Sequence, residues 1–139
     1  MISIYSDAAF VDGHAACATF IINDTTYLGF FTKVYTQLLG SIHSELLAIK
    51  QGLDYIYYSH IEQENITVYT DSEEALRHLN HATKGSKLDN LVQEILEYTK
   101  LYNISFSYIK GHQVAHNPNK VVDSLARHIN YLLISEVIT

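Results

Sequence analysis

The order of the hydrophobic patterns constrains the fold of this chain more than any other feature of its sequence. Three segments with strand character follow one another, and helical and strand patterns then alternate along the rest of the chain. The expected strands are residues 2–7, 14–22, 26–33, 65–70 and 104–110, and the expected helices are residues 41–58, 72–81, 88–101 and about 118–133. The order βββ-α-β-α-α-β-α predicts an α/β fold, in which an antiparallel meander and later parallel crossovers form one five-stranded mixed sheet with helices packed on it.

Local signals set the limits of the expected helices. The apolar side chains in the first helix recur at helical spacing; they are Leu46, Ile49, Leu53, Ile56 and Tyr57. In the next helix, Asp71 is the expected N-cap, and Glu74 completes a capping box with it. Asn117 and Pro118 have the form of an N-cap followed by proline at the first helical position. The periodicity predicts one helix, and the two capping signals predict where two further helices begin.

Length, charge and cysteine content limit the possible classes of protein. A chain of 139 residues predicts one domain that spans residues 1–139. Cys17 is the only cysteine, so an intrachain disulfide is impossible, and we expect a reducing, cytoplasmic setting. The N-terminal sequence does not resemble a signal peptide, and no apolar run approaches the roughly 18 residues of a membrane span. The formal net charge of −6 argues against bulk nonspecific attraction to nucleic acid.

Glu45 does not fit the apolar pattern of its helix. Ile49 lies four residues after Glu45 and Leu53 eight residues after it, so the carboxylate shares the face that should point at the sheet. Burying an uncompensated carboxylate is costly. A basic partner, a raised pKa or a bound metal would compensate Glu45, and a place at the edge of the helix would avoid the cost.

Two aspartates end similar strand segments. The tripeptides Tyr-Ser-Asp and Tyr-Thr-Asp finish at Asp7 and Asp71, and ligands gather beyond the carboxyl ends of strands in such sheets. Asp71 also has an ordinary interpretation as a helix cap, whereas strand-like sequence resumes soon after Asp7. If the two strands are parallel neighbours, these carboxylates lie side by side and repel unless a proton or a cation lies between them. With Glu45 as a third oxygen ligand, Mg²⁺ or Mn²⁺ is favoured over zinc.

A last polar cluster covers residues 108–127. A strand ends near Lys110, His112 opens a polar loop, and Asp123 lies at the border of the final helix's apolar stripe. Each of these residues has an ordinary surface interpretation when it is considered alone. Their order in the sequence gives them a second interpretation.

The sequence resembles a type 1 ribonuclease H over nearly its whole length. The matching strings are YSDAAF with Asp7, HSELLAI with Glu45, VYTDSEEAL with Asp71, KGH with His112 and NKVVDSLAR with Asp123. The resemblance implies the ribonuclease H-like fold, two divalent metal ions (Mg²⁺ or Mn²⁺) and hydrolysis of the RNA strand of an RNA–DNA hybrid. It implies that the four acidic residues hold the metals, and that His112 moves protons or assists product release. Ser41 and Ser72 are the expected substrate contacts.

The sequence departs from the family pattern at several positions. Ala8 and Ala9 follow the first aspartate, where the family commonly has glycine or serine. Ser41 and Ile42 stand near the place of an asparagine that senses the RNA 2′-hydroxyl, and Tyr108 replaces a tryptophan. The long basic protrusion of some members is reduced to residues 84–87. Together with the negative net charge, these differences predict modest, salt-sensitive binding of the hybrid.

Two other functions remain compatible with the sequence. The chain could be a catalytically silent module that binds nucleic acid or regulates a partner on the same fold. It could also be a nuclease of this fold with another substrate, such as a DNA exonuclease or a junction resolvase. The intact acidic residues favour an active ribonuclease H, whereas the missing asparagine favours the silent module.

Overall fold

The computed structural model describes residues 1–24, 26–62, 65–81 and 85–109. Its elements are β1 (Ile2–Val11), β2 (His14–Asn23), β3 (Thr26–Tyr35), α1 (Ser41–Tyr58), β4 (Asn65–Thr70), α2 (Glu73–His81), α3 (Asp89–Glu97), the 3₁₀ helix η1 (Tyr98–Lys100) and β5 (Asn103–Tyr108). The predicted order of elements is therefore confirmed as far as β5. The helix expected at about 118–133 lies outside the described residues.

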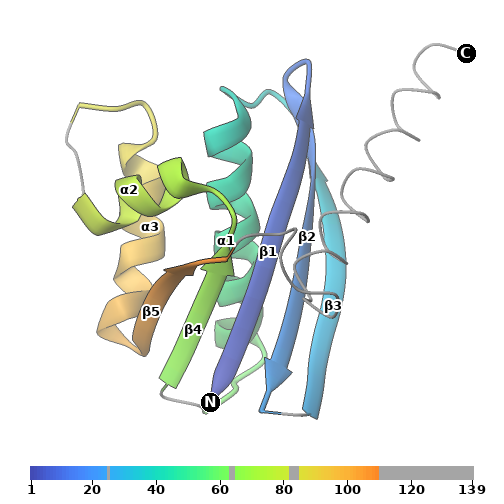
Figure 1. Cartoon of the computed structure of the whole chain (residues 1–139), viewed down its shortest axis with the longest axis vertical. Coiled ribbons are helices and arrows are strands. Elements are labelled where there is room, and N and C mark those ends of the chain that lie inside the picture. The colour runs from blue at the N-terminus through green and yellow to red at the C-terminus, as the bar shows by residue number, and fades with distance from the viewer. Residues whose placement is uncertain (25, 63–64, 82–84, 110–139) are drawn as a thin grey trace, which may run out of the picture.

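The five strands form one mixed sheet in the order β3-β2-β1-β4-β5 (Figure 1). The first three strands pair antiparallel as a meander, and β4 pairs parallel with both β1 and β5. The predicted mixed sheet and the parallel crossovers are thus confirmed. Because α1 connects β3 to β4, the chain returns across the sheet and places β4 beside β1.

The first strand is longer than the sequence predicted. We expected it to end at Asp7, but β1 continues without a break to Val11, and Asp7 pairs with Ala18 of β2. A two-residue turn at Asp12 and Gly13, with φ angles of 50° and 83°, closes the hairpin. Asp-Gly is a favoured sequence for such turns because both central residues need positive φ. The hairpin partner therefore overrides the low strand propensity of aspartate.

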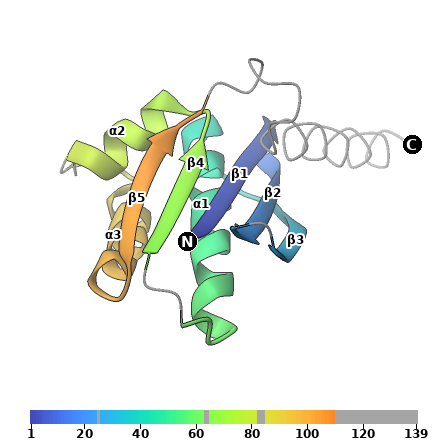
Figure 2. The ribbon, with the colours of Figure 1, turned by 60° about the horizontal axis from the view of Figure 1, so that its bottom comes forward.

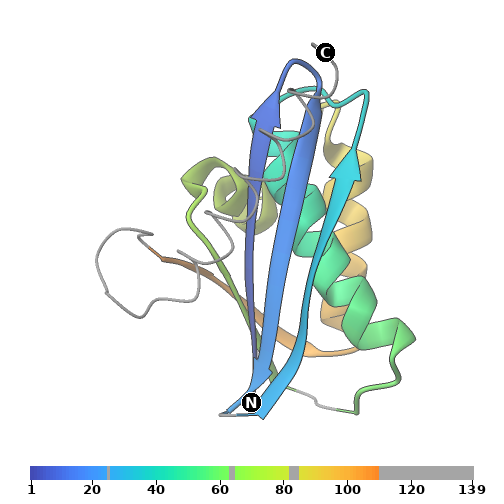
Figure 3. The ribbon, with the colours of Figure 1, turned by 90° about the vertical axis from the view of Figure 1, so that its right-hand side faces the viewer.

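The helices and one face of the sheet enclose a shared apolar core. Four of the five apolar residues predicted for the first helix are fully buried against the strands: Leu46, Ile49, Leu53 and Ile56. Tyr57 was predicted to belong to this face, but it is 45% exposed because it lies at the end of the helix, near η1. Figures 2 and 3 show α1 and α3 on the same side of the sheet.

Among the described helices, none is long and apolar enough to cross a bilayer.

Gly52 brings α1 unusually close to the sheet. A β-carbon at this position would lie 2.7 Å from Cγ2 of Ile4 and 3.1 Å from Cγ2 of Thr19. Such distances are shorter than van der Waals contact, so only glycine allows this approach. The helix that carries Glu45 is therefore seated directly on β1 and β2.

Candidate metal centre

The register between β1 and β4 aligns the two aspartates. The last parallel pair is Tyr5 with Tyr69, whose rings stack with centroids 4.8 Å apart. Asp7 and Asp71 each follow two residues later, so the same register brings them to the same level of the sheet. Asp7 lies within β1, where β4 no longer accompanies the strand, and Asp71 lies just after β4 ends. The expected proximity of the two residues thus arises from parallel pairing, although Asp7 does not end its strand.

The N-terminal cap of α2 is Ser72 and not Asp71. The Ser72 hydroxyl oxygen accepts a hydrogen bond from the backbone N–H of Ala75 at 3.1 Å. Glu74, expected to complete a capping box, instead accepts a hydrogen bond from Arg77 at 2.6 Å. Serine and aspartate are equally good caps, so their order alone could not decide between them. The cap of α2 therefore lies one residue after the predicted position.

Glu45 approaches the two aspartates from the beginning of α1. Carboxylate oxygens of Asp7, Glu45 and Asp71 all lie within 4.8 Å of one another. Asp7 is only 2% exposed, and its Oδ1 accepts a hydrogen bond from the backbone N–H of Ala8 at 2.9 Å. The other two carboxylates are partly exposed. Three carboxylates gathered in this way repel one another, and a cation or a shared proton would relieve the repulsion.

The chemistry of the surrounding donors suits a hard cation. Cys17, on β2, is the only thiol of the chain, and its Sγ donates a hydrogen bond to the carbonyl oxygen of Ser44 at 3.4 Å. Burial, followed by the nearby charges of Glu45 and Asp7, raises the pKa of Cys17. The thiol therefore stays protonated, and the ligand atoms available at the cluster are carboxylate oxygens. Carboxylate oxygen is the donor that Mg²⁺ and Mn²⁺ prefer.

The remaining predicted site residues are placed only in part. His112 and Asp123 lie outside the described residues. Ser41 is exposed at the first position of α1, and Ser72 uses its hydroxyl to cap α2. Contacts of either serine with a substrate stay predictions.

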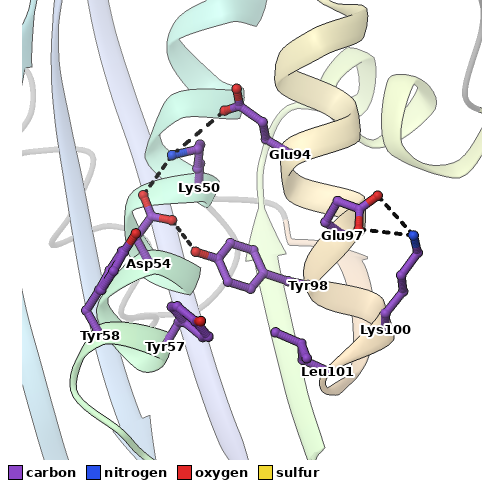
Figure 4. A pocket seen from close by; sticks show the side chains of 9 residues that line it. All are labelled: Lys50, Asp54, Tyr57, Tyr58, Glu94, Glu97, Tyr98, Lys100 and Leu101. Carbon is purple, nitrogen blue, oxygen red and sulfur yellow. Dashed lines mark hydrogen bonds and ion pairs between the residues drawn. The ribbon is translucent and has the colours of Figure 1, made fainter.

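A pocket lies elsewhere on the molecule, between α1 and the segment formed by α3 and η1. This pocket has a volume of about 550 Å³, and Figure 4 shows the side chains that line it. Lys50 contacts Asp54 at 2.9 Å and Glu94 at 3.8 Å, and the Tyr98 hydroxyl donates a hydrogen bond to Asp54 (Figure 4). The three clustered carboxylates do not line it. We did not predict this network, although the spacing of Lys50 and Asp54, four residues apart on a helix, is a recognisable signal.

Solved ribonuclease H structures share this fold. The N-terminal RNase H domain of Rv2228c from Mycobacterium tuberculosis, solved as a fusion with maltose-binding protein, has a TM-score of 0.79 at 15% identity, with 98% of this chain and 97% of that chain covered. RNase H1 from the halophilic archaeon Halobacterium salinarum has a TM-score of 0.74 at 15% identity, with 91% and 94% covered. LC11-RNase H1, isolated from compost by a metagenomic approach and solved in complex with an RNA/DNA hybrid, has a TM-score of 0.76 at 17% identity, with 96% and 99% covered. At these identities the likeness establishes the fold.

The sequence comparison supplies the family. No curated protein matches the sequence. The reverse transcriptase-like family profile matches residues 6–129, which include all five predicted catalytic residues, from Asp7 to Asp123. Residues outside the match are few at either end. The chain therefore belongs to the reverse transcriptase-like family and is a ribonuclease H-like domain.

Proposed function

We propose that this chain is a metal-dependent endoribonuclease that hydrolyses the RNA strand of RNA–DNA hybrids. The observation that carries the proposal is the convergence of Asp7, Glu45 and Asp71, whose oxygens lie within 4.8 Å of one another. These residues come from β1, α1 and the segment that follows β4, and the sheet register and the close seating of α1 on the sheet bring them together. In this proposal Asp123 supplies the fourth carboxylate.

In this proposal the carboxylates hold the metal ions, and His112 transfers protons. Two divalent ions, Mg²⁺ or Mn²⁺, would activate a water and stabilise the leaving oxygen of an in-line displacement. The carboxylates of Asp7, Glu45 and Asp71 would orient these ions, and the burial of Asp7 would hold its oxygen in one position. His112 would carry a proton between water and the reacting oxygens, since an unperturbed histidine titrates near ~6.5.

The substrate assignment is supported by LC11-RNase H1, a similar fold that was solved with an RNA/DNA hybrid. Ser41 at the beginning of α1 would contact the substrate, and Ser72 would contribute a backbone or side-chain contact beside Asp71. With a net charge of −6, binding should be modest and should weaken steeply as salt is raised. A reducing, cytoplasmic setting suits the single buried Cys17.

The direct test is incubation of the purified chain with end-labelled RNA–DNA hybrid in Mg²⁺ or Mn²⁺. Single-stranded RNA and double-stranded DNA serve as controls. Cleavage confined to the RNA strand of the hybrid supports the proposal. Binding without cleavage would identify a catalytically silent module, and cleavage of duplex DNA would identify a nuclease with another substrate.

The roles of His112 and Asp123 can be separated by titrating Mn²⁺ against two variants. His112→Ala should slow turnover by about 10²–10⁴-fold, which is the usual range for general acid–base help, and should barely change metal affinity. Asp123→Asn should weaken metal binding. If both variants weaken it equally, His112 is a metal ligand.

A further inference from the structure

A row of buried polar contacts joins α1 to β2 beside the carboxylate cluster. The Cys17 thiol donates to the carbonyl oxygen of Ser44 at 3.4 Å, and the Thr19 hydroxyl donates to the carbonyl oxygen of Ala48 at 3.2 Å. Both strand residues are fully buried. The acceptors are one helical turn apart, so each holds a successive turn of α1 against the strand.

Gln51 completes this row on the next turn of the helix. Its amide nitrogen donates to Thr19 Oγ1 at 2.7 Å and to the carbonyl oxygen of Cys17 at 3.2 Å. Its amide oxygen accepts a hydrogen bond from the Tyr35 hydroxyl at 3.2 Å. We name Cys17, Thr19 and Gln51, with the groups they contact, the α1–β2 clamp. Gln51 is only 6% exposed, so these contacts are largely shielded from water.

The clamp brackets the carboxylates on the helix and on the sheet. On α1, the acceptors Ser44 and Ala48 stand on either side of Glu45 along the chain. On the sheet, Ala18 pairs with Asp7, and the clamp residues Cys17 and Thr19 are the neighbours of Ala18 in β2. Glu45 therefore lies between two clamped positions of its own helix. Asp7 pairs with Ala18, which lies between two clamped positions of β2.

Apolar packing alone would define this geometry less sharply. Ile49 and Leu53 of α1 pack on the sheet through apolar contacts, and hydrophobic contacts have no preferred direction. Hydrogen bonds weaken steeply when their distance or angle changes. The short approach at Gly52 brings the helix into range of Thr19, and the clamp then fixes the helix along its axis.

We propose that Thr19 and Gln51 are positioning residues, which set the separation of Glu45 from Asp7 and thereby the affinity of the cluster for a divalent cation. This inference rests on the proposed metal-binding function. It assigns to the clamp an effect on cation affinity that is separate from its contribution to stability. Small displacements of a ligand matter because ligating groups must be held within about 0.5 Å of their productive geometry.

The test compares substitutions inside and outside the clamp. Thr19→Val keeps the shape of the side chain but removes the hydroxyl, whereas Thr19→Ser keeps the hydroxyl. Tyr55→Phe is the matched control, because the Tyr55 hydroxyl joins the same helix to β3 by a hydrogen bond to the carbonyl oxygen of Leu28 at 3.1 Å, away from Glu45. For each full-length variant, Mn²⁺ affinity is measured from the electron paramagnetic resonance signal of free Mn²⁺. Stability is measured by urea unfolding without metal.

Thr19→Val should weaken Mn²⁺ binding by about 10–100-fold, the usual effect of losing a group that orients a metal ligand. Thr19→Ser should restore near wild-type affinity. Tyr55→Phe should lower stability without weakening Mn²⁺ binding. Gln51→Leu removes the amide but leaves Thr19 in contact with Ala48, so it should give a smaller loss of Mn²⁺ affinity than Thr19→Val. If Thr19→Val does not fold, a weaker Mn²⁺ affinity of Gln51→Leu than of the wild type tests the clamp by itself.

Three results would overturn the inference. If Thr19→Val and Gln51→Leu bind Mn²⁺ as tightly as the wild type, or if Tyr55→Phe weakens binding to the same extent, the clamp serves stability alone and the proposed metal site still stands. If the wild-type chain itself binds no Mn²⁺ at millimolar concentration, both the clamp's role and the proposed function are rejected.

Discussion

Glu45 and Asp54 lie on the same helix, yet they occupy opposite electrostatic surroundings. Asp54 accepts a hydrogen bond from the Lys50 ammonium at 2.9 Å and another from the Tyr98 hydroxyl. Glu45 lies instead with two more carboxylates, all within 4.8 Å. Both side chains are partly buried, so the difference comes from their neighbours and not from exposure.

This difference separates a structural carboxylate from a candidate functional one. At Asp54 the chain itself supplies the opposite charge and a hydroxyl donor, which offset the cost of burial. At Glu45 the fold brings two further carboxylates within 4.8 Å, and a bound cation or proton would relieve the repulsion between these like charges. Clustering of like charges in a folded chain is therefore the stronger sign of ligand binding.

The largest expected effect is on catalysis at the carboxylate cluster. Asp71→Asn should reduce cleavage of hybrid by more than about 10²-fold, because even residues that only orient metal ligands have effects of about 10–100-fold. The fold should survive, since Ser72 and not Asp71 caps α2. Cleavage rate and urea unfolding are measured together.

Asp54→Asn provides the control for that comparison. It removes a carboxylate from the same helix as Glu45 and should leave cleavage close to wild type, while lowering stability because Lys50 loses its nearest partner. If Asp71→Asn cleaves at the wild-type rate, or if both variants lose activity equally, the contrast between the two regions has no functional meaning.

A second expected effect is stabilisation by divalent metal. A ligand that binds only the folded state at 100 times its Kd adds about 2.7 kcal/mol to the free energy of unfolding. For a chain of this size, that corresponds to a rise in Tm of roughly 5–15 °C. Thermal unfolding with saturating Mn²⁺ should show this rise for the wild type and for Asp54→Asn. Asp7→Asn should shrink it, and an unchanged wild-type Tm would argue against a preformed site.

Much of the fold was predictable because its signals are local. Strand and helix periodicities gave the order of elements, and four of five apolar residues predicted for α1 are buried. The errors arose where two local signals competed. β1 was predicted to end at Asp7 because aspartate has a low strand propensity, but the hairpin closed by Asp12 and Gly13 extends the strand. At α2, Asp71 was predicted as the cap, whereas the adjacent Ser72 caps the helix.

The site was predictable only in part because it depends on long-range pairing. That Asp7 and Asp71 lie together required β1 and β4 to be neighbours, and sequence patterns could state this only as a condition. The structure meets the condition and places Glu45, the predicted third carboxylate, beside the pair. The α1–β2 clamp was missed because Thr19 and Gln51 carry no signal until the helix is seated on the strand. The metal-binding and catalytic roles of the predicted residues stay predictions.

A smaller effect is expected from Tyr98→Phe in the second region. The variant loses the hydroxyl that donates to Asp54, and a hydrogen bond to a charged group is worth about 1.5–3 kcal/mol before solvent exposure reduces it. Because Asp54 is partly exposed and keeps Lys50, we expect a loss of about 1 kcal/mol in the free energy of unfolding. Urea unfolding tests the loss, and Mn²⁺ titration should detect no change. A weakened Mn²⁺ affinity would mean that the two regions are coupled.

The smallest expected effect concerns Tyr35, which lies between the two regions. Its hydroxyl donates to Gln51 of the clamp, and burial, followed by the proximity of Cys17 and Asp54, raises its pKa from 10.0 to about 12. Because the folded-state pKa lies above the unfolded value, its contribution to stability is complete below pH 10 and is lost as pH rises from 10 through 12. The loss at pH 11 should not exceed about 1 kcal/mol, since Tyr35 is partly exposed. Urea unfolding at pH 8 and at pH 11 should therefore show a larger fall for the wild type than for Tyr35→Phe. If the free energy of unfolding falls equally in both proteins, Tyr35 has the same pKa in the folded and the unfolded chain.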